Sequence, residues 1–190
     1  MSTTTPDTAR PLDTVLRRWP SVAGVAFATF VAWGLASGGD LAPVLTASAF
    51  VYLGAAAVGR RGAAWPLFFV TFVVIGVASF TTYEDSAVWI LVALGAVLLV
   101  FGLQRGEGRP FAGLPLQGLA ALAFCGAAAA ALLVGGDLAA YLVAAGLLAH
   151  AAWDVYHHRV ERVVSRSLAE FCVVLDTILA VVIVVVTLRG

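Results

Sequence analysis

Long uncharged apolar stretches alternate with short polar breaks along almost the whole chain, and this pattern is its main structural signal. A helix needs about 20 apolar residues to cross a hydrocarbon core of about 30 Å, and the stretches recur with that length. Lipid offers no partner for backbone polar groups, so each stretch must be helical unless the chain closes into a barrel. The pattern predicts an all-α, polytopic membrane protein, a bundle of seven transmembrane helices. The predicted spans are Trp19–Ser37, Leu41–Gly59, Ala63–Thr82, Ser86–Leu103, Leu114–Val134, Leu138–Tyr156 and Ser167–Leu188.

Composition supports this class. Of the 190 residues, 62% are hydrophobic and 12% charged, and the mean hydropathy is +0.99. An ordinary soluble domain is about 45–50% apolar and about 25% charged, so a soluble domain and a disordered chain are both excluded. All 11 basic residues are arginine, which excludes any chemistry that needs a lysine amine, such as a Schiff base. Cys125 and Cys172 lie in apolar runs and predict packing, not a disulfide framework.

The arginines predict the orientation of the spans. Every second loop is basic, and the alternate loops hold only Asp40, Glu84 with Asp85, and Asp137. The basic groups are Arg10, Arg17 and Arg18, then Arg60 and Arg61, then Arg105 and Arg109, then Arg159, Arg162 and Arg166. By the positive-inside rule, we expect an inner (plasma) membrane protein with a cytoplasmic amino terminus and a carboxyl terminus outside.

Residues 1–18 precede the membrane domain, which is expected to cover 19–188. Leu12, Val15, Leu16 and Trp19 recur at helical spacing beside two arginines, which predicts a short interfacial helix. A basic flank that only sets topology is the alternative interpretation.

An internal repeat is also indicated. The string GGDLA occurs at Gly38–Ala42 and again at Gly135–Ala139. The same offset aligns spans one and two with spans five and six, which predicts halves 19–83 and 111–188 joined by a linker helix at 86–104. Four spans separate the copies, so they share an orientation, as in parallel transporter repeats. This 3-1-3 plan resembles SWEET-type sugar transporters in architecture, but the chain has no Pro-Gln pair and we assign no family.

Acidic and histidine side chains within the spans are confined to the last two. Span six holds His150, Asp154, His157 and His158, and span seven holds Glu170 and Asp176. The first three follow one another by four and three residues, which predicts a common helix face. At about 1.5 Å per residue, His150 and Asp176 both lie roughly 12 Å inside the cytoplasmic boundary. We therefore expect them to meet.

Three interpretations fit a His150, Asp154, His157 and Asp176 cluster. It joins two helices through polar contacts; or it binds a metal, with the nitrogen and oxygen ligands that suit zinc; or it moves protons or substrate. The leading functional hypothesis is a small transporter or proton-linked permease of unknown substrate. A zinc-dependent intramembrane hydrolase and a non-catalytic membrane scaffold are the alternatives, so the sequence leaves open whether the protein is an enzyme.

The expected partners are the lipid bilayer and a small molecule or ion. No phosphate-binding loop, no Ser-His-Asp set and no nucleic-acid signature occurs, so no nucleic acid is expected. The cofactor is left unknown, with zinc as the candidate, and no cofactor-binding residues are assigned.

Overall fold

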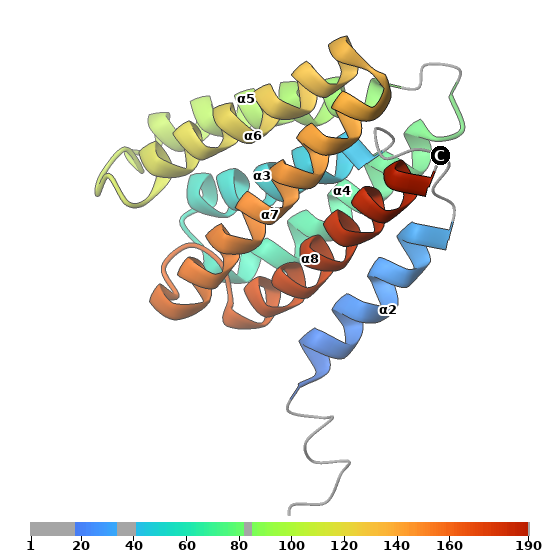
Figure 1. The fold of residues 1–190 in the computed structure, drawn as a ribbon. Helices are drawn as coiled ribbons and strands as arrows, with labels where there is room; N and C mark the ends of the chain where they lie inside the picture. The colour runs from blue at the N-terminus through green and yellow to red at the C-terminus, as the bar shows by residue number, and fades with distance from the viewer. Residues whose placement is uncertain (1–17, 34–40, 82–84, 190) are drawn as a thin grey trace, which may run out of the picture.

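The computed structural model describes residues 18–33, 41–81 and 85–189, which form seven α-helices, one short 3₁₀ helix and no strand (Figure 1). The helices are α2 (Trp19–Trp33), α3 (Ala42–Val58), α4 (Ala64–Ala78), α5 (Ser86–Gln104), α6 (Leu114–Val134), α7 (Gly136–Val160) and α8 (Arg166–Arg189), with η2 (Arg61–Ala63) before α4. The interfacial helix predicted within 1–18, and the first GGDLA as far as Asp40, lie outside the described residues.

Each helix falls on one of the seven predicted spans. Five stretches are long and apolar enough to cross a membrane, by length and composition: Arg61–Ala78, α5, α6, α7 and α8. The other two helices, α2 and α3, have 15 and 17 residues and are apolar but shorter. The molecule is therefore an all-helical protein with five candidate membrane spans in its described part.

Glycines in the left-handed region set two of the helix boundaries. Gly59 ends α3 with φ +68°, and its N–H donates to the carbonyls of Ala55 and Ala56. Gly135 and Gly136 have φ +62° and +56° and reverse the chain between α6 and α7. Only glycine adopts these angles without strain, so the second GGDLA string makes a tight helical hairpin.

Helix α7 is longer than the predicted span at both ends, running from Gly136 to Val160 where Leu138 to Tyr156 was expected. The polar residues after Tyr156 continue the helix because they find a partner or solvent: His157 is buried against Gln117, and Arg159 is exposed. The helix ends at Val160, and its C-cap residue Glu161 adopts the left-handed conformation with φ +47°.

Helix α3 is the centre of the bundle. It packs against α4, α5, α6 and α7, while α8 lies along α7 on one side and α2 on the other (Figure 1). Small residues allow the closest approaches, as is usual for helices in lipid. A Cβ on Gly102 of α5 would lie 2.8 Å from the Cα of Ala57, and one on Gly24 of α2 would lie 2.8 Å from the carbonyl oxygen of Phe171.

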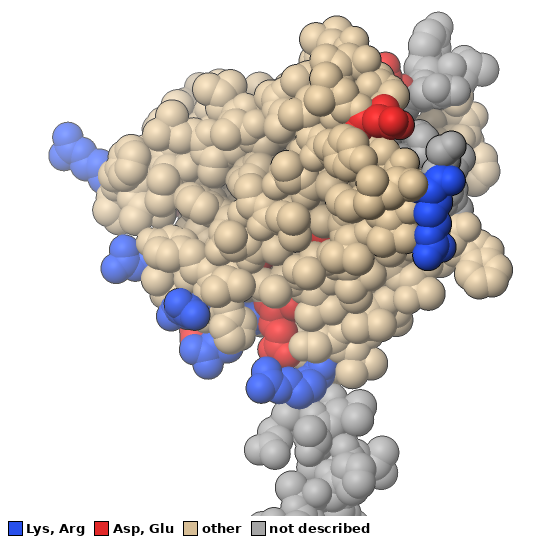
Figure 2. All heavy atoms as spheres, in the orientation of Figure 1, with Lys and Arg blue, Asp and Glu red and all other residues tan. Residues whose placement is uncertain are grey.

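Uncharged side chains cover most of the face of the molecule seen in Figure 2, and the charges gather towards its ends. Large side chains such as Trp33, Phe80 and Leu133 are at least 85% exposed. An apolar surface of this extent is expected where a protein contacts lipid. Most of the arginine side chains seen in Figure 2 lie at the end of the bundle where α2 begins and α3 ends. Arg189 is the last residue of α8, a helix that ends on the opposite side of the bundle (Figure 1).

Candidate functional site

Three ionisable side chains meet in the interior where α7 packs on α8. His150 and Asp154 come from α7, Asp176 comes from α8, and all three residues are completely buried. His150 Nδ1 lies 2.9 Å from Asp176 Oδ2 and 3.1 Å from Asp154 Oδ2. The structure thus brings together the two residues expected to meet across the helix pair, with Asp154 beside them.

The hydrogen bonding of this cluster is incomplete. An imidazole Nδ1 carries at most one proton, yet two carboxylate oxygens face it. His150 Nε2 and Asp176 Oδ1 are buried and have no hydrogen-bond partner among the described residues. Burying a polar atom without a partner costs about 1–3 kcal/mol of folding free energy, so these two atoms destabilise the folded protein.

Tyr52 of α3 is a fourth member, which the sequence analysis did not assign to the cluster. Its hydroxyl donates a 2.5 Å hydrogen bond to Asp154 Oδ1, and its ring stands edge-on to His150 with centroids 5.2 Å apart. Its position in the sequence indicates a buried role, because Tyr52 falls in the middle of its predicted span. Aromatic residues that anchor a helix at the membrane–water interface lie near the ends of a span. A buried tyrosine hydroxyl needs a hydrogen-bond partner.

His157 belongs to a separate polar pair. Its Nε2 lies 3.0 Å from the amide nitrogen of Gln117 on α6, and its Nδ1 lies 3.0 Å from the carbonyl oxygen of Trp153. The Trp153 indole N–H in turn donates to Gln117 Oε1 at 3.3 Å. Gln117 was also missed, although it is the only amide side chain within a predicted span.

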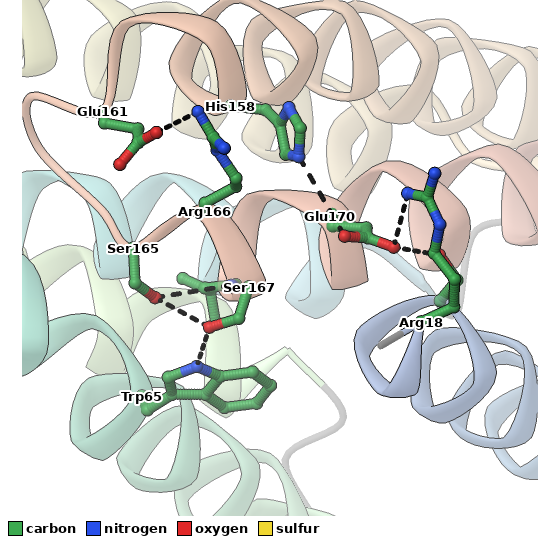
Figure 3. Close-up of polar contacts among 10 residues, drawn as sticks. Arg18, Trp65, His158, Glu161, Ser165, Arg166, Ser167 and Glu170 are labelled. Carbon is green, nitrogen blue, oxygen red and sulfur yellow. Dashed lines mark hydrogen bonds and ion pairs between the residues drawn. The ribbon is translucent and has the colours of Figure 1, made fainter. Parts of the chain in front are cut away.

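The remaining polar residues of the last two spans form a third group, at the basic end (Figure 3). Glu170 accepts a 2.5 Å hydrogen bond from Ser21 and lies 3.5 Å from Arg18 and 4.0 Å from His158. These contacts attach α2 to α8, and they include none of the buried cluster. Glu161 pairs nearby with Arg166, and Arg61 also contacts it.

A cavity of about 520 Å³ lies among α2, α3, α4 and α8. Its walls are mostly apolar and rich in aromatic rings: Phe27, Phe30, Phe68, Phe72 and Phe80. Tyr52 and Cys172 also line it, and Cys172 lies one helical turn before Asp176 on α8. Because Tyr52 both lines the cavity and binds Asp154, it connects the cavity to the buried cluster.

Three members of the cluster have the chemistry of metal ligands. His150, Asp154 and Asp176 each offer one ligand atom, and these atoms lie within 4.8 Å of one another. A catalytic zinc takes three protein ligands of nitrogen, oxygen or sulfur and keeps one open position. His157 does not join this set, because both of its ring nitrogens have other partners.

Comparison of the chain with protein-family models, with curated proteins and with solved structures gives no match. The interpretation of the cluster therefore rests on its geometry and chemistry.

Proposed function

We propose that the protein is a seven-span inner-membrane permease in which the cluster of His150, Asp154 and Asp176 exchanges a proton during transport. The amino terminus is cytoplasmic and the carboxyl terminus is outside. The gathering of most arginines at one end of the bundle supports this orientation (Figure 2). The two short helices, α2 and α3, cross the membrane with the five longer ones, because α3 is buried at the centre of the bundle and the exposed apolar side chains of α2 continue its outer surface.

The main support for the proposal is the net charge of the buried cluster. Two ionised carboxylates and one protonated imidazole leave a net charge of −1 in the protein interior. No arginine of the described ranges pairs with Asp154 or Asp176. An unpaired buried charge is very costly, so the cluster must hold one further proton or another cation. A site that must bind a cation to become neutral is suited to proton coupling.

The surroundings of His150 would make its proton sensitive to the state of the bundle. Asp154 on its own helix, Asp176 and Cys172 on α8, Tyr52 on α3 and His157 are the titratable groups around it. They come from three helices, so a relative movement of α3, α7 and α8 changes which carboxylate the imidazole faces. Proton release would thereby be linked to a change of packing.

The cavity favours a predominantly apolar substrate. A strongly hydrated solute would lose water on entering the cavity without gaining polar partners there. An aromatic cation differs from other charged solutes, because the phenylalanine rings would contact both its apolar surface and its charge. A cation would also be drawn towards the acidic cluster beyond Tyr52. We therefore propose exchange of an apolar organic cation for a proton, and ethidium, a flat aromatic cation, is a suitable probe.

Vesicles that contain the purified protein and a trapped pH indicator test this function. With an acidic lumen, external ethidium should cause proton loss from wild-type vesicles, and Asp176→Asn should reduce the rate about tenfold or more. Asp137→Asn is the matched control, because Asp137 is exposed in the first turn of α7. Equal rates for wild type and Asp176→Asn would contradict the proposal, and would favour a purely structural cluster.

Infrared spectra give a second test that needs no substrate. The proposal requires a protonated carboxylic acid in the cluster, whose band is lost as the pH is raised and is absent from Asp176→Asn. Carboxylates that stay ionised at every pH at which the protein is folded would rule out proton exchange.

A zinc-dependent hydrolase is the second candidate, favoured by the proximity of the three potential ligand atoms. Zinc would neutralise both carboxylates, and His150, Asp154 and Asp176 would hold it while it activates a water molecule. Elemental analysis of purified protein distinguishes the two functions. Stoichiometric zinc that is lost in His150→Ala would favour the hydrolase, and its absence would favour the permease or a scaffold.

The 3-1-3 repeat is part of the proposed architecture. Its support is the shared GGDLA string and the even number of spans between the copies. The test is superposition of α2, α3 and α4 on α6, α7 and α8 in an experimental structure, about an axis near the membrane normal. A match that instead needs an axis in the membrane plane would contradict a parallel repeat.

A further inference from the structure

A second cavity, of about 280 Å³, lies at the basic end of the bundle, where three connections between helices meet. Arg60 follows α3, Arg109 lies between α5 and α6, and Arg162 lies between α7 and α8, and all three line this cavity. We call it the arginine pocket. These arginines are far apart in sequence, so the fold itself concentrates their charge.

The arginines of the pocket are free to bind an anion. Among the described residues, Arg18, Arg61 and Arg166 pair with Glu170 or Glu161, whereas the three arginines of the pocket have no ion-pair partner. The single carboxylate that lines the pocket, Glu107, lies over Gly59 and outside ion-pair distance of them. The lining thus has three positive charges and one negative charge, a formal excess of two.

Two further features of the pocket indicate the class of ligand that fits it. The 21-residue helix α6 begins at the pocket, with Gly113 and Leu114 in its lining, so the positive end of the helix dipole adds to the arginine charge. The rest of the lining is mainly apolar, including Ala55, Ala56 and Val163. A ligand that combines an anionic group with apolar atoms fits such a pocket better than a fully hydrated anion.

We propose that the arginine pocket binds the phosphate group of an anionic membrane phospholipid. Guanidinium groups bind phosphate oxygens through paired, charge-assisted hydrogen bonds. Basic pockets between membrane helices on the cytoplasmic side are suited to anionic headgroups. The proposal rests on the orientation of the bundle given above, and it is independent of proton exchange at His150.

The test compares two double variants that each remove two exposed arginines from the same end of the bundle. Arg109→Gln with Arg162→Gln alters the pocket, whereas Arg105→Gln with Arg159→Gln removes neighbouring arginines that do not line it. Short-chain dioctanoyl phosphatidylglycerol is titrated into full-length protein in detergent, and binding is followed calorimetrically. The pocket variant should bind about tenfold or more weakly than wild type, and the control variant should bind as wild type does.

A substitution in the opposite direction guards against misfolding of the arginine variants. Glu107→Gln removes the only carboxylate of the lining and should tighten phosphatidylglycerol binding. If both double variants bound phosphatidylglycerol equally weakly, the binding would depend on the general positive charge of this surface and not on the pocket, and the proposal would be overturned. Equal binding of dioctanoyl phosphatidylcholine, or competition by inorganic phosphate at similar concentrations, would overturn an anionic-lipid site. Asp176→Asn should bind the lipid normally, which separates this result from the outcome for transport.

Discussion

Tyr52 and Asp154, 102 positions apart in sequence, are joined by a buried 2.5 Å hydrogen bond between α3 and α7. Asp154 also faces His150, which in turn faces Asp176 on α8. One continuous set of polar contacts therefore links the central helix to the α7–α8 pair. Because Tyr52 also lines the larger cavity, the contact joins the proposed substrate site to the proposed proton site.

Tyr52→Phe should destabilise the protein by about 1–3 kcal/mol, because it leaves Asp154 Oδ1 buried without a donor. Tyr141→Phe is the matched control, since Tyr141 is 40% exposed and the same hydroxyl is lost at the surface. Thermal unfolding in detergent measures both. A Tyr52→Phe protein as stable as the Tyr141→Phe protein would mean that the hydrogen bond contributes nothing net.

The two aspartates should differ in their effect on stability. Asp154 has Tyr52 and His150 as partners, whereas Asp176 has His150 alone and an unpartnered Oδ1. Asp154→Leu leaves the buried Tyr52 hydroxyl without an acceptor, keeps the unsatisfied Asp176 Oδ1 and should cost several kcal/mol, whereas Asp176→Leu removes that oxygen and leaves His150 with Asp154. Unfolding measurements should therefore rank Asp154→Leu as the less stable variant, and the reverse order would contradict this bonding pattern.

Hydropathy predicted the helices because the need to satisfy backbone hydrogen bonds in lipid leaves few other structures. Equal depth on neighbouring helices likewise predicted that His150 and Asp176 approach each other. Both inferences depend only on helix geometry and the direction of the chain.

The other members of the polar core depend on which helices are neighbours, and the sequence pattern does not contain that information. Tyr52 and Gln117 are neutral and come from α3 and α6, so charge patterning did not indicate them. His157 shares a helix face with His150, but seven residues separate the two by about 10 Å along the axis. A common face therefore did not make a common site.

Close packing between α3 and α5 gives a prediction that does not involve polar groups. A Cβ at Gly102 would meet Ala57 Cα at 2.8 Å, and backbone cannot move aside cheaply. Gly102→Ala should cost about 1–3 kcal/mol of stability. Gly126→Ala, in α6, meets nothing within 4 Å and should be neutral or stabilising by up to about 1 kcal/mol. Equal melting temperatures for the two variants would show that α5 shifts to admit the methyl group.

Reporter fusions test the orientation on which both proposals depend. Fusions after Arg61, Arg109 and Arg166 should report the cytoplasm, because the arginines of these connections resist translocation. Fusions after Thr81 and Gly136 should report the far side. If α2 and α3 did not cross the membrane, the loops from Arg61 onward would keep their sides, since two spans are lost together. A fusion after Trp33 is therefore decisive, because it reports the far side only if α2 crosses the membrane.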